Sequence, residues 1–233
     1  MAIITFAVAK KWCTPMSLSV VKSTWKETWS EAVKRQQIII GTTIMMSVVF
    51  TMPLFFTHIE KRQGTLIKDP VLAGIPPHDV SLLIFAIIWS MILLIIVRAA
   101  YKPSIYIIYC WALIPITLAR FIAISIVPLE PPIGLQPLID PLTGIFYGQH
   151  FITKDLFFSG HIATMTLIFL CLRKKTDRII GFIATIAVAF LLLVQHIHYT
   201  IDILASPGIV YICYRLTRRF LDKELDITVP FKR

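Results

Sequence analysis

The sequence predicts an all-α membrane protein, a six-transmembrane helix bundle with both termini in the cytosol and an interfacial amphipathic helix near the N-terminus. Three observations lead to this prediction. Hydrophobic residues make up 57% of the 233 residues and charged residues only 15%, which is less charge than a soluble domain of this size carries. Six apolar stretches approach the roughly 20 residues that a spanning helix needs. The basic residues fall mostly on one side of these stretches.

The six predicted spans follow one another without an internal repeat or a Gly/Ser linker. They cover residues 37–57, 80–97, 104–127, 159–172, 179–195 and 200–217. The fourth and fifth are short, so each is expected to use flanking residues or to begin below the headgroup level. The predicted organisation is a cytosolic segment 1–35, a membrane domain 36–217 and a cytosolic tail 218–233. Residues 2–8 are too few for a span and lack a leading positive charge, so no cleaved signal peptide is expected.

The distribution of lysine and arginine predicts the orientation in the membrane. Of the 23 basic residues, 18 lie in the N-terminal segment, the second and fourth loops and the tail, whereas four lie in the loops of the other side. Arg120 falls inside the third span. The positive-inside rule therefore predicts that both termini are cytosolic.

The net charge of +10 is explained by this topology and by attraction to anionic lipids, so no nucleic-acid partner is expected. The four cysteines are Cys13, Cys110, Cys171 and Cys213. Their spacing matches neither a disulfide framework nor a zinc site, and all four are expected to be thiols.

Residues 17–35, SLSVVKSTWKETWSEAVKR, are expected to form the interfacial helix. Val21, Trp25 and Trp29 lie four residues apart on one stripe, and four basic residues accompany them. This pattern is typical of a helix that lies on the cytosolic face with its tryptophans at headgroup depth.

Under this topology every histidine falls at or near the non-cytosolic face. The six are His58, His78, His150, His161, His196 and His198. Because positive charge is depleted on that face, the histidines were not placed to set the topology. Titratable groups gathered at helix ends indicate a polar site there.

The fourth span opens with Ser159-Gly160-His161. Serine is a favourable N-cap, glycine permits close approach of another group, and a helix start offers N–H groups and a positive dipole that suit a phosphate. His161 would project at that end. The alternative is a capped helix that carries an interfacial histidine without a chemical role.

The sixth span opens with His198-Tyr199-Thr200-Ile201-Asp202. If this segment is helical, His198 and Asp202 share one face, and the carboxylate can fix one imidazole nitrogen and leave the other free to attack. The alternative is a pair that only fastens two helices. His196 and His198 are two residues apart and face different sides of a helix, so no metal site is expected.

Arg120 lies seven residues, about 10 Å of helix, inside the outer end of the third span. Arginine at that depth costs free energy unless it faces a cavity or a partner. Its planar fork suits a phosphodiester. The alternatives are a structural pair with an acidic residue of the outer loop, or a side chain that extends outward to the headgroups. The candidate partners are Glu130, Asp140 and Asp155.

The two histidine motifs together resemble the sphingomyelin synthase branch of the type-2 phosphatidic acid phosphatase (PAP2) superfamily, which includes plant phosphatidylcholine:diacylglycerol cholinephosphotransferase. The segments that carry the resemblance are DLFFSGH (155–161) and HIHYTID (196–202). The hallmarks of the branch, F-S-G-H and H-Y-T-x-D, are both intact. Looser likenesses are IPPHDVS (75–81) and RFIAISIVPLEPP (120–132).

The chain departs from the phosphatases of this superfamily. They carry K-x6-R-P, and the sequence contains no R-P dipeptide. They also carry S-R about six residues before the second histidine, where this chain has Leu192 in an apolar run. Because those basic residues hold the phosphate in the phosphatases, their absence favours the transferase branch.

The resemblance implies a phospholipid headgroup phosphotransferase that acts through a phosphohistidine. Phosphocholine or phosphoethanolamine would pass from a glycerophospholipid donor to the hydroxyl of a ceramide or diacylglycerol acceptor. His198 would be the nucleophile, His161 the general acid and base, and Asp202 the group that orients His198. The expected substrate contacts are Arg120, Ser159, Gly160 and Tyr199.

The same resemblance implies a multi-pass integral membrane protein whose active site opens on the non-cytosolic face, without metal or cofactor. Two alternatives remain open. One is a lipid phosphate phosphatase or phospholipase C-like hydrolase of the superfamily, and the other is a non-enzymatic lipid-binding scaffold. The sequence leaves a homo-oligomer open as well.

Overall fold

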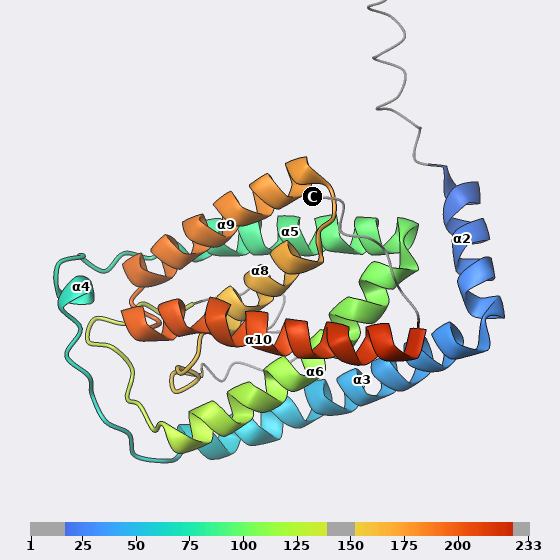
Figure 1. The fold of residues 1–233 in the computed structure, drawn as a ribbon. Coiled ribbons are helices and arrows are strands. Elements are labelled where there is room, and N and C mark those ends of the chain that lie inside the picture. Colours follow the sequence, from blue (N-terminus) through green and yellow to red (C-terminus); the bar gives the residue numbers. More distant parts are fainter. Residues whose placement is uncertain (1–16, 139–151, 226–233) are drawn as a thin grey trace, which may run out of the picture.

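The computed structural model describes residues 17–138 and 152–225, which form helices and loops without a β-strand (Figure 1). The expected all-α fold is therefore found. Within these ranges four helices are long and apolar enough to cross a membrane. They are α3 (Ala32–Glu60), α5 (Ser81–Tyr101), α6 (Pro103–Ile126) and α9 (Lys175–Val194).

The predicted fourth and sixth spans fall on helices of a different kind. The fourth, α8 (Gly160–Cys171), has only 12 residues, or about 18 Å of helix against the ~30 Å of a hydrocarbon core. The sixth, α10 (Thr200–Leu225), has 26 residues but is less apolar than the four long helices. The count of six spans thus stays a prediction.

The short helix α8 lies in the middle of the bundle, where it contacts α5, α6, α9 and α10. Met165, Leu167 and Ile168 on different sides of this helix are completely buried. A helix that is apolar all round is one enclosed by protein.

Helix α9 is longer than α8, the helix that precedes it. The two helices are joined by a turn at residues 172–174 and α9 has 20 residues, eight more than α8. Eight residues correspond to about 12 Å of helix. The end of α9 therefore extends beyond the beginning of α8, and the N-terminal end of α8 is set inside the bundle.

Helices α3 and α6 run side by side along the lower edge of Figure 1. The indole of Trp111 on α6 donates to the carbonyl of Gln37 on α3 at 3.0 Å. A Cβ added at Gly41 would lie 2.6 Å from that indole nitrogen, so the close approach requires glycine.

The stretch 17–35, expected as one interfacial helix, is divided at Glu31 into α2 (Leu18–Ser30) and the first turn of α3. Helix α2 stands across the right-hand end of the bundle in Figure 1. Its Trp25 indole donates to the carbonyl of Ala100 at 2.8 Å and packs edge-on against Tyr106, with ring centroids 5.8 Å apart. The helix is thus docked on the connection between α5 and α6. Its place at the membrane interface stays a prediction.

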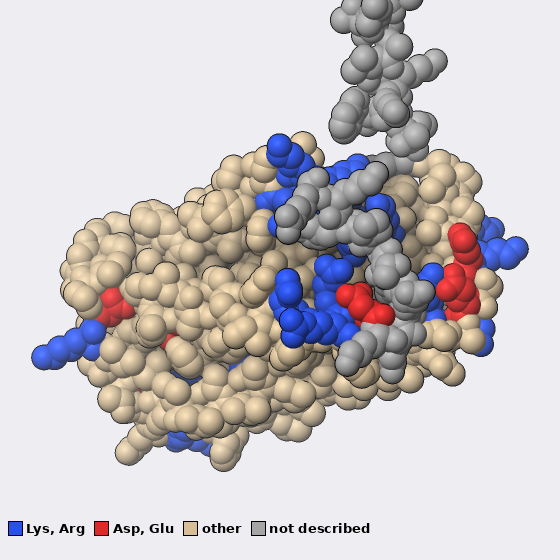
Figure 2. Space-filling view, in the orientation of Figure 1, with Lys and Arg blue, Asp and Glu red and all other residues tan. Residues whose placement is uncertain are grey.

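The surface separates charged ends from an apolar middle. Figure 2 shows lysine and arginine gathered mainly toward the end where α2 lies, with an almost uncharged surface between that end and the other. On α9 the exposed apolar side chains are Ile179, Ile180, Phe182, Ile183, Ile186 and Phe190. Exposed apolar surface of this extent fits contact with lipid, and the chain is an integral membrane protein.

At the basic end, Arg98 joins the last turn of α5 to the first turn of α9. Its Nε lies 2.6 Å from Oδ2 of Asp177 and its second terminal nitrogen 3.0 Å from Oδ1, a two-pronged pair. The Asp177 side chain is 6% exposed and that of Arg98 is 26% exposed.

We expect Asp177→Asn to lower the stability of the protein by about 1–3 kcal/mol, because it leaves a largely buried guanidinium without its counter-charge. The midpoint of thermal unfolding in detergent measures this loss. Asp222→Asn is the matched control, since its partner Arg218 lies 3.9 Å away and its side chain is 44% exposed. Equal midpoints for the two variants would contradict the structural role of the Arg98–Asp177 pair.

Candidate active site

His198 and Asp202 meet at the beginning of α10, although by a different geometry from the predicted one. The helix begins at Thr200, so His198 lies in the turn before it and the expected helical spacing is wrong for this residue. Oδ2 of Asp202 accepts the N–H of Tyr199 at 3.0 Å, a reciprocal cap of the first turn. The same oxygen lies 3.6 Å from Nδ1 of His198. This separation is longer than a hydrogen bond and within the range of an ion pair.

His161 lies beside this pair at the beginning of α8. The centroids of the His161 and His198 rings are 6.0 Å apart, and Phe85 of α5 packs edge-on against His161 at 6.4 Å. Ser159 caps the helix by accepting the N–H of Ile162 at 3.5 Å. The two motifs that the sequence singled out are therefore close together in space.

Hydrogen bonds between the two helix starts fix this proximity. The N–H of Ser159 donates to the carbonyl of Asp202 at 3.3 Å. The hydroxyl of Ser206, one turn further along α10, lies 2.9 Å from the carbonyls of both Ser159 and Asp202. All three residues are fully buried. We call these contacts the α8–α10 junction.

Arg120 of α6 lies against the same helix start. It is buried, and its guanidinium pairs with the carboxylate of Asp155, one of the three partners that the sequence allowed. A Cβ added at Gly160 would lie 2.5 Å from Cζ of Arg120, too close for any real contact. Glycine therefore lets the guanidinium sit directly on the first residue of α8, next to His161. Glu130 pairs with Lys154 instead, and Asp140 lies outside the described residues.

Three buried polar atoms of this cluster have no hydrogen-bond partner among the described residues. They are Nε of Arg120, Nδ1 of His198 and Oδ1 of Asp202. Buried polar atoms are almost always hydrogen-bonded, and exceptions call for an explanation such as a ligand. Their concentration at one place distinguishes it from the rest of the core.

The side chain of Tyr199 contacts the loops that contain Glu130 and Ile67. Its hydroxyl donates to the carbonyl of Glu130 at 2.9 Å and accepts the N–H of Ile67 at 3.3 Å. The residue is 1% exposed. These contacts give the hydroxyl a structural use, whereas the sequence analysis assigned Tyr199 to the substrate.

Asp69 connects the loop between α3 and α4 to the start of α10. It caps the short helix α4 (Pro70–Ala73) through the N–H groups of Val71 and Leu72, and its second oxygen accepts the N–H of Thr200 at 2.7 Å. Burial raises the pKa of Asp69. The hydrogen bonds from Thr200 and α4 together lower it by more than burial raises it, so the pKa lies below the ordinary value of 3.8.

The turn between α9 and α10 is hydrogen-bonded to the loop before α5 and to the loop after α6. Gln195 is fully buried; its side-chain oxygen accepts the N–H of Val80 at 2.6 Å, and its nitrogen donates to Ser81 at 2.9 Å. The ring nitrogens of His196 lie 2.9 Å and 2.8 Å from the carbonyls of Ile133 and Ile75. His196 therefore belongs to the scaffold around the site.

Sequence reasoning missed Asp69, Gln195 and Ser206. A capping signal for Asp69 is present in the sequence, since an aspartate before Pro70 is typical of a helix start. Gln195 and Ser206 give no comparable signal, because their partners are far away in the chain.

In the ranges 17–138 and 152–225, no group of three or more His, Cys, Asp or Glu side chains could hold a metal ion.

Comparison with known families identifies the C-terminal part of the chain. The family model described as PAP2 superfamily C-terminal matches residues 154–219, so a domain of this family is found there. The match contains α8, α9 and most of α10, with both histidine motifs, whereas Arg120 lies outside it. Members of this superfamily are generally phosphoryl-transfer enzymes, which indicates a lipid-related phosphatase or phosphotransferase type of function. A search of curated proteins returned no match.

We expect Asp69→Asn to lower the thermal midpoint at pH 7 and to reduce the decrease of the midpoint at acid pH. The pKa of Asp69 is depressed in the folded state, so its stabilisation is present above its unfolded pKa and is lost as the pH falls through the folded value. Thermal unfolding at several pH values measures this dependence. Glu27→Gln on α2 is the control, and a native-like acid profile for Asp69→Asn would contradict the assignment.

Proposed function

We propose that this protein is a phospholipid headgroup phosphotransferase of the sphingomyelin synthase-like branch. It would move phosphocholine or phosphoethanolamine from a glycerophospholipid to a lipid hydroxyl. The observation that supports this most directly is the 6.0 Å separation of the His161 and His198 rings, with the buried carboxylate of Asp202 behind His198. A phosphoryl group between the rings would be within reach of both, because reacting atoms in productive complexes lie about 3–3.5 Å apart.

In the first step of the proposed reaction, Nε2 of His198 bonds to phosphorus. The bond between phosphorus and the glyceride oxygen breaks, and protonated His161 transfers its proton to that oxygen, which leaves as diacylglycerol. The imidazole becomes cationic on phosphorylation. Asp202, with Oδ2 beside Nδ1 of His198, would hold the tautomer that frees Nε2 and would stabilise this charge.

In the second step, the acceptor hydroxyl gives its proton to His161 and its oxygen bonds to phosphorus. The bond between phosphorus and His198 breaks, which restores both histidines to their starting protonation. The charges balance with these three side chains and the two lipids, so the scheme calls for no metal or cofactor.

The negative charge of the phosphodiester would be met at the start of α8. Arg120 lies directly on Gly160, and the helix start offers N–H groups and the positive end of its dipole. Ser159, as the cap, sets the direction of that first turn. A single arginine suits a monoanionic diester better than a dianionic monoester, which is also the reason that a phosphatase is the less favoured function.

The proposed placement in the membrane follows the sequence prediction. With α8 and α10 as the fourth and sixth membrane segments, both termini would be cytosolic, α2 would lie at the cytosolic interface, and the site would open on the opposite face. The headgroup would then reach the start of α8 from the non-cytosolic leaflet. Donor and acceptor would both reach it from the bilayer. Assembly with further copies of the chain is compatible with this scheme.

Transfer requires that a lipid hydroxyl rather than water reaches the phosphohistidine. The decisive experiment mixes purified protein in nanodiscs with a fluorescent acceptor, either ceramide or diacylglycerol, and with phosphatidylcholine or phosphatidylethanolamine. Labelled acceptor that carries the headgroup supports the proposal. Inorganic phosphate from phosphatidic acid without acceptor product would support a phosphatase, and absence of turnover with every lipid would support a scaffold.

We expect His198→Ala to lower acceptor turnover by at least about 10³-fold while the protein stays folded, because the nucleophile is lost. The same nanodisc assay and the thermal midpoint measure the two quantities. His58→Ala is the matched control, since His58 is an exposed histidine near the end of α3. Near-normal product formation by His198→Ala would overturn the assignment.

We expect Gly160→Ala to lower turnover by about 10²-fold, because the added methyl group would displace the Arg120 guanidinium from the start of α8. Gly208→Ala on α10 is the matched control, since no atom lies within 4 Å of an added Cβ there. Turnover and the thermal midpoint are compared for the two variants. Unchanged turnover in Gly160→Ala would show that the position of Arg120 does not matter for the reaction.

A further inference from the structure

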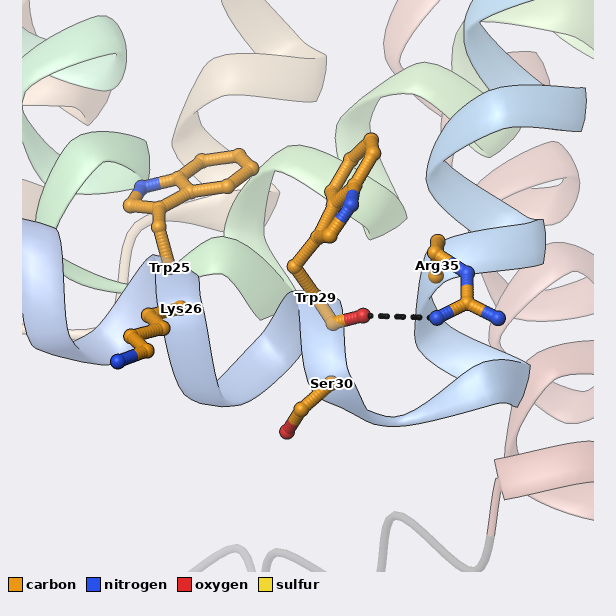
Figure 3. A pocket seen from close by; sticks show the side chains of 5 residues that line it. All are labelled: Trp25, Lys26, Trp29, Ser30 and Arg35. Atoms are coloured by element: carbon orange, nitrogen blue, oxygen red, sulfur yellow. Dashed lines mark hydrogen bonds between the residues drawn. The ribbon is translucent and has the colours of Figure 1, made fainter.

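An open surface cavity lies at the basic end of the molecule, where α2 turns into α3. Its volume is about 530 Å³, and it is lined by Trp25, Lys26, Trp29, Ser30 and Arg35. Figure 3 shows the two indole rings projecting from the same side of α2, with Arg35 approaching from α3 next to Trp29. Lys26 and Ser30 point to the other side of α2.

Contacts with the rest of the fold hold two parts of this cavity in place. The indole of Trp25 is bonded to Ala100, which fixes one side. Arg35 donates from one terminal nitrogen to the carbonyl of Trp29 at 3.3 Å. Because a guanidinium carries five N–H donors, this bond positions the group and leaves further donors for a ligand.

The walls of the cavity combine an aromatic surface with a positive charge. The Trp29 side is solvent-exposed, with 47% of the residue accessible, so an aromatic surface is presented to the outside at the mouth of the cavity. Tryptophan prefers the headgroup level of a membrane, where one part of the ring is apolar and the N–H is wet. The cationic group of Arg35 stands beside this surface, and Lys26 lies on the exposed rim.

The charge around the cavity favours an anion. Glu31 at the junction of α2 and α3 is paired with Lys34 at 2.8 Å. Glu27 on α2 is the other acidic residue close by in the chain. The net charge of the chain is +10, and Figure 2 shows basic side chains gathered toward this end. A partner with negative charge and an apolar body is therefore complementary to the cavity.

We propose that this cavity binds the headgroup of an anionic phospholipid from the leaflet at the basic end of the bundle. The phosphate would contact Arg35, and the glycerol and upper acyl region would lie against Trp25 and Trp29. A free phosphate ion would use only Arg35 and would leave the indole walls without a function. The site is separate from the histidine cluster and would exist whether or not the cluster transfers headgroups.

The test measures tryptophan fluorescence of the full chain in phosphatidylcholine nanodiscs with an increasing fraction of one acyl-brominated lipid. Brominated phosphatidylserine is compared with brominated phosphatidylcholine. We expect quenching by the anionic lipid to saturate at a low fraction, and Arg35→Gln to raise the half-saturating fraction about fivefold. Arg35→Lys should shift it less. Lys26→Gln, on the other side of α2 from the indole rings, should shift it less than Arg35→Gln does.

Arg219→Gln is the matched control, because Arg219 is an exposed arginine near the end of α10 that does not line the cavity. It should leave the half-saturating fraction unchanged. Equal shifts for Arg35→Gln and Arg219→Gln would overturn the proposal in favour of diffuse attraction. Equal quenching by both brominated lipids, or displacement of the anionic lipid by inorganic phosphate, would overturn it as well.

Discussion

The α8–α10 junction is the contact on which the candidate site depends. Two histidines 37 positions apart in the sequence have a defined separation because the first turns of their helices share hydrogen bonds through Ser159, Asp202 and Ser206. One of these bonds joins two backbone groups, and the other two link the buried Ser206 hydroxyl to backbone carbonyls. Asp202 has two uses, since its carbonyl joins the helices while its carboxylate caps α10 and faces His198. Asp202 therefore belongs both to the contact between the helices and to the candidate site.

Arg120 introduces a second constraint, which is electrostatic. An arginine inside an apolar bundle requires a partner, and Asp155 in the segment before α8 provides one. The pair holds the guanidinium over Gly160, where a side chain would exclude it. The contact with Asp155 thus both neutralises the charge of Arg120 and positions its guanidinium. The loops before α5 and before α4 are bonded to the start of α10 and the turn before it through Gln195, His196 and Asp69.

The sequence predicted the helical membrane class and brought together His161, His198 and Asp202, because hydropathy and short motifs are local signals. It also named Asp155 among the partners of Arg120. The predicted sixth span began at residue 200, as α10 does, whereas the helical spacing considered for His198 and Asp202 assumed a start at 198. The contact from Asp69 to Thr200, which comes from a residue 131 positions away, could not be predicted. The junction through Ser206 was out of reach for the same reason. The use of Tyr199 in loop packing also depends on distant residues, Glu130 and Ile67.

The order of synthesis gives the Arg120–Asp155 pair a consequence for assembly. The two residues are 35 positions apart, so the ribosome produces the arginine well before the aspartate. When α6 enters the bilayer, its cation has no carboxylate available from that segment, and translocation scales assign arginine at a helix centre a cost of about 2.5–3.5 kcal/mol. Helix α6 is rich in isoleucine, and its most apolar 18-residue window has a mean hydropathy of 2.0, which offsets this cost during insertion. The apolar character of α6 thus serves biogenesis first, and only later does the completed fold neutralise the charge.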